Sequence, residues 1–187
     1  MTIIIGLTGL AGSGKSEISK HLLEKHGFSK LVFSDILREE AAKRRLLEGK
    51  SYEEQKFALS KLGEVLRKES GRMDILAVKL VEKIVSGNYD NIIVDGFRSA
   101  EEVNLFRKNF DDFYLVLVET DENIRFNRRK MEDPSITIEN IRSRDKRDIE
   151  ELGLSKVIEM ADFKVENNDS ISSLHEEIDN IVEGIIG

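Results

Sequence analysis

The chain has 187 residues, of which 40% are hydrophobic and 35% charged, and its formal net charge is −7. This composition predicts one globular domain with a sizeable core, and the negative charge argues against a nucleic-acid-binding protein, which usually needs a basic surface. The absence of cysteine excludes disulfides and thiolate metal sites, and no apolar run is long enough for a signal peptide or a membrane span, so we expect a cytoplasmic protein without membrane partners.

Short apolar, β-branched runs alternate with longer amphipathic stretches, which is the pattern of repeated β-α-β units around a parallel sheet. The fold class is therefore predicted to be α/β. Five strands are predicted, at Ile3–Leu7, Lys30–Phe33, Asn91–Val94, Phe113–Glu119 and Asp162–Glu166.

Helical patterns fill the intervals between these strands. The first helix is predicted from Lys15 to about Lys25 and ends at Gly27, a residue type common after helix C-termini. Capping boxes are predicted at Ser51 with Glu54 and at Ser99 with Glu102, where each pair opens a helix. The long interval between the second and third strands predicts three helices, Asp35–Leu47, Tyr52–Glu69 and Arg72–Val85.

A single domain with two excursions is expected. Residues 34–87 exceed what a simple crossover needs, so they are predicted to include a helical insertion that carries a substrate site. Residues 121–150 are predicted to form a small lid, because two arginine-rich helices flank a polar loop that holds Pro134. The core then comprises residues 1–33, 88–120 and 151–187.

The segment Gly9–Ser16 reads GLAGSGKS and matches the phosphate-binding pattern G-x-x-x-x-G-K-[ST] between a strand and a helix. In such a loop, backbone N–H groups and the helix N-terminus bind phosphate oxygens. We expect Lys15 to reach the β- and γ-phosphates of ATP and Ser16 to hold Mg²⁺. The predicted ATP-binding residues here are Gly9, Gly12, Ser13, Gly14, Lys15 and Ser16.

Asp95 ends the predicted third strand, at the edge of the sheet where ligands bind in open α/β folds. We expect its carboxylate to orient Mg²⁺-bound water. The alternative role is that of a helix or turn cap.

The histidines His21, His26 and His175 predict no metal site. His21 and His26 lie five residues apart, not the three or four that bring two side chains to one face of a helix. We therefore expect helix-surface residues.

Two groups of arginines flank the Pro134 loop, and they predict positive charge around a transferred phosphoryl group. The alternative for each is a solvated surface cation beside a local carboxylate. The first group is Arg125, Arg128 and Arg129, and the second is Arg142, Arg144 and Arg147.

No guanine-reading Asn-Lys-x-Asp segment follows a late strand, which excludes a GTPase, and a large AAA-type ATPase would need a longer chain. A small kinase remains. Asp95–Arg98 resembles the Asp-Gly-Phe-Pro-Arg segment of adenylate kinases without the proline, and Ser34–Arg38 resembles their Gly-Asp-x-Leu-Arg segment. Ala161–Asn167 resembles the last strand of dephospho-CoA kinases. The chain thus resembles archaeal-type adenylate-kinase-related and dephospho-CoA-kinase-like proteins over nearly its whole length.

This resemblance implies a P-loop NTPase fold with a five-stranded parallel sheet in the order 2-3-1-4-5, and transfer from Mg²⁺-ATP to a small nucleotide-like acceptor. It implies that Arg128 lies near the ATP base and that Arg144 acts beside Lys15 and Asp95 at the transferred phosphate. The acceptor-binding residues that it implies are Ser34, Arg38, Arg67, Gly96, Phe97 and Arg98.

Two acceptor chemistries stay open. A nucleoside monophosphate attacks through an ionised phosphate oxygen and needs arginines, whereas the hydroxyl of dephospho-CoA benefits from a carboxylate base. Arg38 suits the first, and Asp35 is a candidate base, a partner of Mg²⁺-bound water or a helix N-cap. We expect a monomeric or weakly oligomeric nucleoside monophosphate kinase, with a dephospho-CoA kinase as the alternative. From another class, the alternative is a nucleotide-binding regulatory module with slow ATP hydrolysis.

Overall fold

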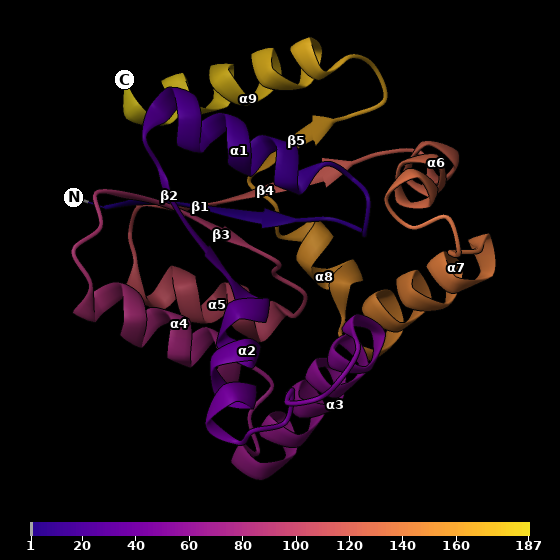
Figure 1. Ribbon diagram of the computed structural model, residues 1–187. Helices are drawn as coiled ribbons and strands as arrows, with labels where there is room; N and C mark the ends of the chain where they lie inside the picture. The colour runs from indigo at the N-terminus through magenta and orange to yellow at the C-terminus, as the bar shows by residue number, and fades with distance from the viewer. Residues whose placement is uncertain (1) are drawn as a thin grey trace.

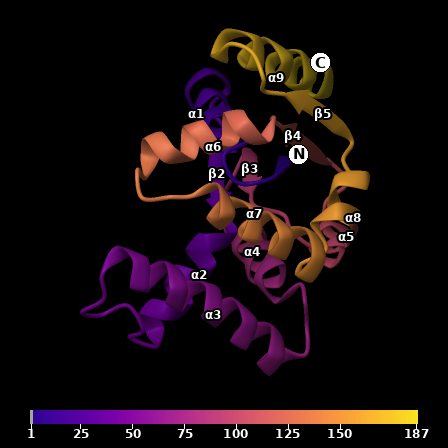
Figure 2. The same cartoon turned by 90° about the vertical axis from the view of Figure 1, so that its right-hand side faces the viewer.

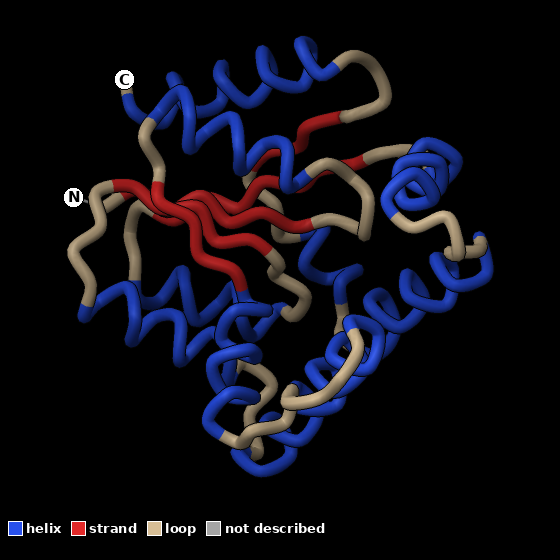
Figure 3. The backbone as a smooth tube through the Cα atoms, viewed as in Figure 1, coloured by secondary structure: helices blue, strands red, loops and turns tan. Residues whose placement is uncertain are grey.

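The computed structural model describes residues 2–187. Within them, five strands form one parallel sheet in the order β2-β3-β1-β4-β5 (Figures 1 and 3). The predicted α/β class and strand order are confirmed. The strands are β1 (Ile3–Thr8), β2 (Ser29–Val32), β3 (Asn91–Asp95), β4 (Phe113–Glu119) and β5 (Phe163–Glu166).

Helices cover both faces of the sheet. Helices α1 and α9 lie on one face, and α4, α5 and α8 lie on the other (Figure 1). Helices α2 and α3 project away from the sheet, and α7 lies between α3 and α6 (Figure 2). Helices α6 and α7 and the π-helical turn that follows α7 are called the arm. The bounds are α1 (Lys15–His26), α2 (Phe33–Lys43), α3 (Tyr52–Ser70), α4 (Ile75–Ser86), α5 (Ala100–Asn109), α6 (Glu122–Glu132), α7 (Ile138–Lys146), the π-helical turn η1 (Arg147–Glu151), α8 (Leu154–Glu159) and α9 (Ile171–Ile186).

The core has two parts because successive strand residues point to opposite faces of the sheet. Ile4 belongs to the cluster under α4 and α5, together with Phe106, and Ile5 belongs to the cluster under α1 and α9, together with Ile18 and Ile178. Each of these side chains is fully buried. Replacing Phe106 by alanine is expected to cost about 3–5 kcal/mol, since a cavity would remain.

The predicted last residue of the second strand and the predicted last residue of the helix after it were both wrong. Phe33 was expected to finish the second strand, but it is the first residue of α2, where its ring packs edge-on against Phe97 with 5.0 Å between centroids. Phe97 lies far from Phe33 along the chain, so the local sequence pattern gave no sign of this contact. The helix ends at Lys43 rather than Leu47, because Arg45 adopts a left-handed φ of 53° that a helix does not continue through.

Both predicted capping boxes are present at the starts of α3 and α5. The third helix of the long interval begins at Ile75 rather than Arg72, whose guanidinium instead pairs with Asp74 at 2.8 Å ahead of the helix. Helix α4 contributes Leu76 and Leu80 to the main core. The division of the chain into core, insertion and lid stays a prediction. Within residues 2–187, no helix has both the length and the apolar character that a bilayer crossing requires.

Candidate functional site

A cavity of about 540 Å³ opens at the carboxyl ends of β1 and β3. These strands are neighbours in register, with Leu7 opposite Asp95, so the loops that follow them meet at one edge. The remaining walls come from the start of α2, from α3 and from the arm of α7 and η1. Segments far apart in the sequence thus enclose one space.

The loop Gly9–Ser16 forms one wall of this cavity. Gly9 has a φ of 133° and packs so closely on the Val118 carbonyl that a Cβ atom would collide with it. The backbone of Ser13 is held from behind, because its carbonyl accepts hydrogen bonds from Thr120 Oγ1 and Asn167 Nδ2, both at 2.8 Å. The loop is therefore fixed in shape by the ends of β4 and β5.

Lys15 folds over this loop. Its Nζ donates to the carbonyl oxygens of Gly9 at 2.6 Å and Leu10 at 3.0 Å. Burial lowers the pKa of Lys15 to about 8, opposed by the carboxylate of Asp95 and assisted by the positive charge of Arg98. A half-buried ammonium held by neutral carbonyls is ready to exchange them for phosphate oxygens.

Asp95 ends β3 beside the loop, opposite Leu7 of β1, lines the same cavity and is 9% exposed. Lys30 Nζ lies 3.6 Å from its Oδ2, a contact that the sequence analysis did not predict. The sequence signal that could have indicated this contact is that Lys30 is a charged residue within the short strand β2, which pairs with β3. The Ser16 hydroxyl and the Asp95 carboxylate line the same cavity, and such oxygen donors fit Mg²⁺.

Three arginines of the site converge on one buried carboxylate, Asp148, which is 3% exposed. Its oxygens lie 3.8 Å from Arg98 Nη1, 3.9 Å from Arg144 Nε and 3.5 Å from Arg147 Nη2. Burial lowers the pKa of Arg144, and the nearby positive charge of Arg98 adds to the effect. From the sequence, only a carboxylate nearby along the chain was considered as the partner of each arginine, whereas the convergence of Asp148 with Arg98 depends on the fold.

The arm and α3 are joined across the cavity. Arg147 Nη1 donates to Ser60 Oγ at 3.2 Å. Arg147 lies in the π-helical turn, a feature often found at functional sites. Arg129 also lines the cavity and pairs with Glu132 at 2.6 Å.

Five of the predicted acceptor-binding residues line the cavity, namely Ser34, Arg67, Gly96, Phe97 and Arg98. Asp35 and Arg38 are absent from the cavity lining: they pair with each other at 3.0 Å, and more than half of each side chain is exposed. Their proposed roles stay predictions.

Arg67 has a buried partner that the sequence analysis assigned only to capping. Its Nη2 lies 3.7 Å from Oε1 of Glu102, while the other oxygen of Glu102 accepts from the backbone N–H groups of Arg98 and Ser99. Burial raises the pKa of Glu102, and these hydrogen bonds and Arg67 oppose the rise. One carboxylate thus connects α3 to the segment after β3.

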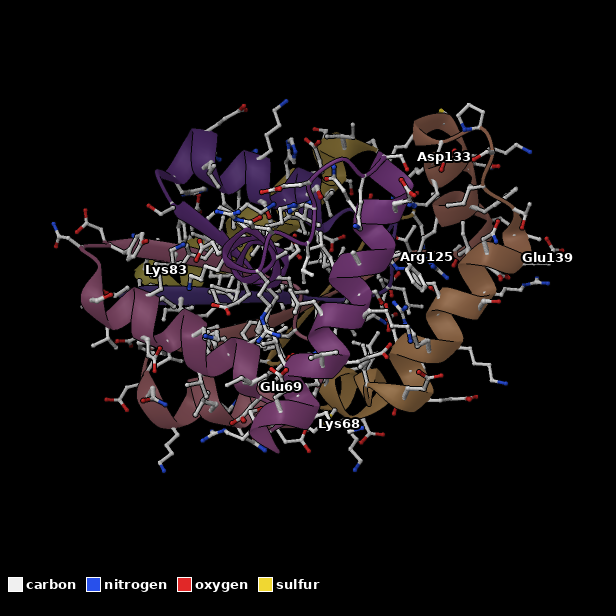
Figure 4. All side chains as sticks on the ribbon, turned by 60° about the horizontal axis from the view of Figure 1, so that its bottom comes forward. Lys68, Glu69, Lys83, Arg125, Asp133 and Glu139 are labelled. Carbon is white, nitrogen blue, oxygen red and sulfur yellow. The ribbon has the colours of Figure 1, made fainter. Side chains whose placement is uncertain are left out.

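The other lid arginines lie outside the cavity lining. Arg125 is buried, pairs with Asp145 at 2.8 Å and donates to the Ala11 carbonyl, so it braces the phosphate loop against the arm. Figure 4 shows Arg125 on the inner side of the arm, whereas Glu139 points outward from it. Arg128 Nη2 donates to the carbonyl and the side-chain oxygen of Asn167 at 3.2 and 3.1 Å. Its predicted role at the ATP base stays a prediction.

The histidines were expected to be helix-surface residues, but their side chains are mostly buried and lie together. His21 and His26 both contact Asp179 of α9, and His175 stacks on His21. Spacing along one helix could not reveal this cluster, because its carboxylate comes from more than 150 residues further along the chain.

Comparison with families and relatives gives a consistent assignment. A family model described as an AAA domain, AAA_18, matches residues 5–150, so the length argument against AAA-type proteins does not hold for this family. A UPF0200/UPF0201 protein of Archaeoglobus fulgidus is 37% identical over 188 residues, covering 96% of this chain and 54% of that protein, so the chain spans about half the length of this relative. The UPF0200 protein TK1334 of Thermococcus kodakarensis is 36% identical over 192 residues and covers 98% of each chain.

Solved structures share the fold over nearly the whole chain. TT1252 from Thermus thermophilus aligns with a TM-score of 0.60 at 20% identity, covering 100% of this chain and 99% of that one. Shikimate kinase from Acinetobacter baumannii, in complex with shikimate, aligns with a TM-score of 0.58 at 14% identity, covering 98% and 94%. At these identities the likeness shows a P-loop kinase-like fold.

Proposed function

The chain belongs to the AAA domain family and to the UPF0200 family, and we propose that it is a kinase that transfers the γ-phosphoryl group of ATP to a nucleoside monophosphate-like acceptor. The observation that carries the proposal is the composition of the cavity wall. The phosphate loop forms one part of the wall, and Ser34, Arg67 and Arg98, which come from other segments, contribute further parts. A protein that only hydrolyses ATP has little use for further, arginine-lined parts.

In this proposal the donor is bound by the loop Gly9–Ser16. Lys15 exchanges its carbonyl partners for oxygens of the β- and γ-phosphates, and Arg144 neutralises charge on the transferred group. Ser16 and Asp95 would hold Mg²⁺, directly and through water, and the ion would neutralise phosphate charge when bound. Arg147 and Ser60, which connect the arm to α3, would help to exclude water from the reacting groups.

The environment of the cavity carboxylates favours a phosphate acceptor over a hydroxyl acceptor. A hydroxyl benefits from a carboxylate base within hydrogen-bond reach. Among the described residues, four of the five carboxylates that line the cavity, Glu64, Asp95, Glu102 and Asp148, each have a lysine or arginine within 4.0 Å, the fifth being Glu151 of η1, and Asp35 is outside the cavity lining. A phosphate that is already ionised needs no base, and the arginines suit it. Dephospho-CoA therefore remains the second choice.

The test is an ADP-release assay with Mg²⁺-ATP against AMP, CMP, UMP, GMP, their deoxy forms, dephospho-CoA and shikimate. Shikimate is included because one of the solved structures with a similar fold is a shikimate kinase in complex with shikimate. Strong stimulation by a monophosphate, lost in Lys15→Ala, is the expected result. Stimulation only by dephospho-CoA or shikimate would replace the acceptor class, and a slow rate indifferent to every acceptor would favour the regulatory module.

A further inference from the structure

A cluster of histidines and carboxylates joins α1 to α9 on the face of the sheet opposite α4 and α5 (Figure 1). His21 Nε2 and His26 Nε2 lie 2.8 and 2.7 Å from the same oxygen, Oδ1 of Asp179. The three atoms lie within 4.8 Å of one another. Nitrogen and oxygen atoms from two separate helices therefore converge on one point.

The three side chains are only 14–15% exposed, so the cluster is held by its surroundings and still reachable by solvent. A tetrahedral Zn²⁺ with bonds of about 2.0–2.1 Å keeps its ligand atoms roughly 3.3 Å apart. The two nitrogen–oxygen distances would have to widen by only about 0.5 Å to admit the ion. Water would complete the coordination from the solvent side.

The charges around the cluster favour a cation. Asp179 is joined by Glu17, which contacts His175 Nε2 at 3.0 Å, and by Glu183, which interacts electrostatically with Lys25. With the imidazoles neutral, as metal ligation requires, the charges of Asp179, Glu17 and Glu183 and the ammonium of Lys25 sum to −2. A divalent cation would balance it.

We propose that His21, His26 and Asp179 bind a divalent transition-metal ion of the Zn²⁺ class, which fastens the C-terminal helix α9 to the helix α1 that follows the phosphate loop. Two imidazoles with one carboxylate suit Zn²⁺, Co²⁺ or Ni²⁺ better than Mg²⁺, which prefers oxygen ligands. This site is separate from the cavity that Ser16 and Asp95 line.

Two neighbours fit the roles of supporting residues. His175 stacks on His21 with ring centroids 3.8 Å apart and an interplanar angle of 16°, which fixes the orientation of a ligand ring. Lys25 Nζ contacts the other Asp179 oxygen at 2.7 Å, but half of its side chain is exposed, so it can move toward Glu183 when a cation binds. Lys25 is thus a competitor for the carboxylate.

The experiment is a titration of the chelator-treated, nucleotide-free protein with Co²⁺ and then Zn²⁺. We expect one Co²⁺ per chain with the visible absorption of a tetrahedral site, displacement by Zn²⁺, and a rise in melting temperature with either ion. His26→Gln keeps a donor that can reach Asp179 but removes the imidazole, and it should lose both the absorption and the melting shift. Asp95→Asn should keep both, because it alters only the other site.

Two further variants separate a metal site from an ordinary ion-pair cluster. Lys25→Ala should bind Co²⁺ at least as tightly as the wild type, because it removes the competing ammonium. His175→Ala should weaken binding by about 10–100-fold and keep the tetrahedral spectrum. An absent Co²⁺ spectrum in the folded wild type, or the same spectrum in folded His26→Gln, would overturn the proposal.

Discussion

Oδ1 of Asp148 lies 3.8 Å from Nη1 of Arg98, so the π-helical turn of the arm contacts the segment that follows β3. The same carboxylate is the neighbour of Arg144 and Arg147. Without it, three guanidinium groups would repel one another beside the phosphate loop. The charge pattern of the site therefore depends on a residue that the arm places at its centre.

Asp148→Asn should lower kcat/KM for phosphoryl transfer by about 100-fold, because the arginines would lose their common partner and their alignment. Steady-state kinetics at saturating ATP would measure it. Glu150→Gln, in the same turn but 62% exposed, is the matched control and should change little. Equal kinetics in the two variants would contradict the role of Asp148.

The affinity for ATP should fall about tenfold between pH 7 and pH 9 at constant Mg²⁺. The pKa of Lys15 is about 8 in the free protein, and phosphate binds the protonated amine, so binding above that pH requires proton uptake. Calorimetric titration of ATP at several pH values would detect the slope. Lys15→Arg should bind more weakly without this slope, since arginine stays charged; an identical slope in both proteins would assign it to another group.

The free energy of unfolding of the ligand-free protein should also depend on pH because of Lys15. Lys15 has a folded-state pKa of about 8, below its ordinary value of 10.5, so the unfolded chain binds more protons between these values and stability rises with pH there. Lys15→Met should remove a rise of about 2–3 kcal/mol across that window. Urea unfolding at pH 8 and 10 would measure the difference, and parallel pH profiles would count against a buried charge at Lys15.

Arg98→Ala should raise the KM for the acceptor by about 10–100-fold, because a charge-assisted bond to phosphate is lost. Arg38→Ala should change it by less than about threefold if its exposed pairing with Asp35 persists during turnover. Initial rates with varied acceptor would separate the two. A comparable increase for Arg38→Ala would show that α2 brings this side chain into the cavity when the acceptor binds.

Ser99→Ala should destabilise the protein by about 0.5–2 kcal/mol, since Ser99 accepts from the backbone of Glu102 at the start of α5. Thermal or urea unfolding would measure the change. Ser51→Ala removes the corresponding cap of α3 at an exposed position and should cost less. The reverse order would show that burial of the α5 cap is unimportant.

Local patterns made much of the fold predictable. The strands, α1 and the starts of α3 and α5 followed from the period of apolar residues and from capping residues, and these signals lie within a few residues of each other. The phosphate loop was also recognisable from the sequence, because the glycines, Lys15 and Ser16 that surround a phosphate lie close together in one motif. The strand order came from resemblance to known kinases, not from periodicity.

The features that only the tertiary structure decided are contacts between distant segments. Lys30 reaches Asp95, Glu102 joins Arg67, and Asp148 gathers its arginines because neighbouring elements place them together, and no spacing in the sequence encodes that. His21 and Asp179 are 158 residues apart. Thus the sequence by itself determined the strands, the helices up to the start of α5 and the glycine-rich loop Gly9–Ser16, whose interactions are local. The partners of the charged side chains depended on packing, because those interactions act through space between residues far apart along the chain.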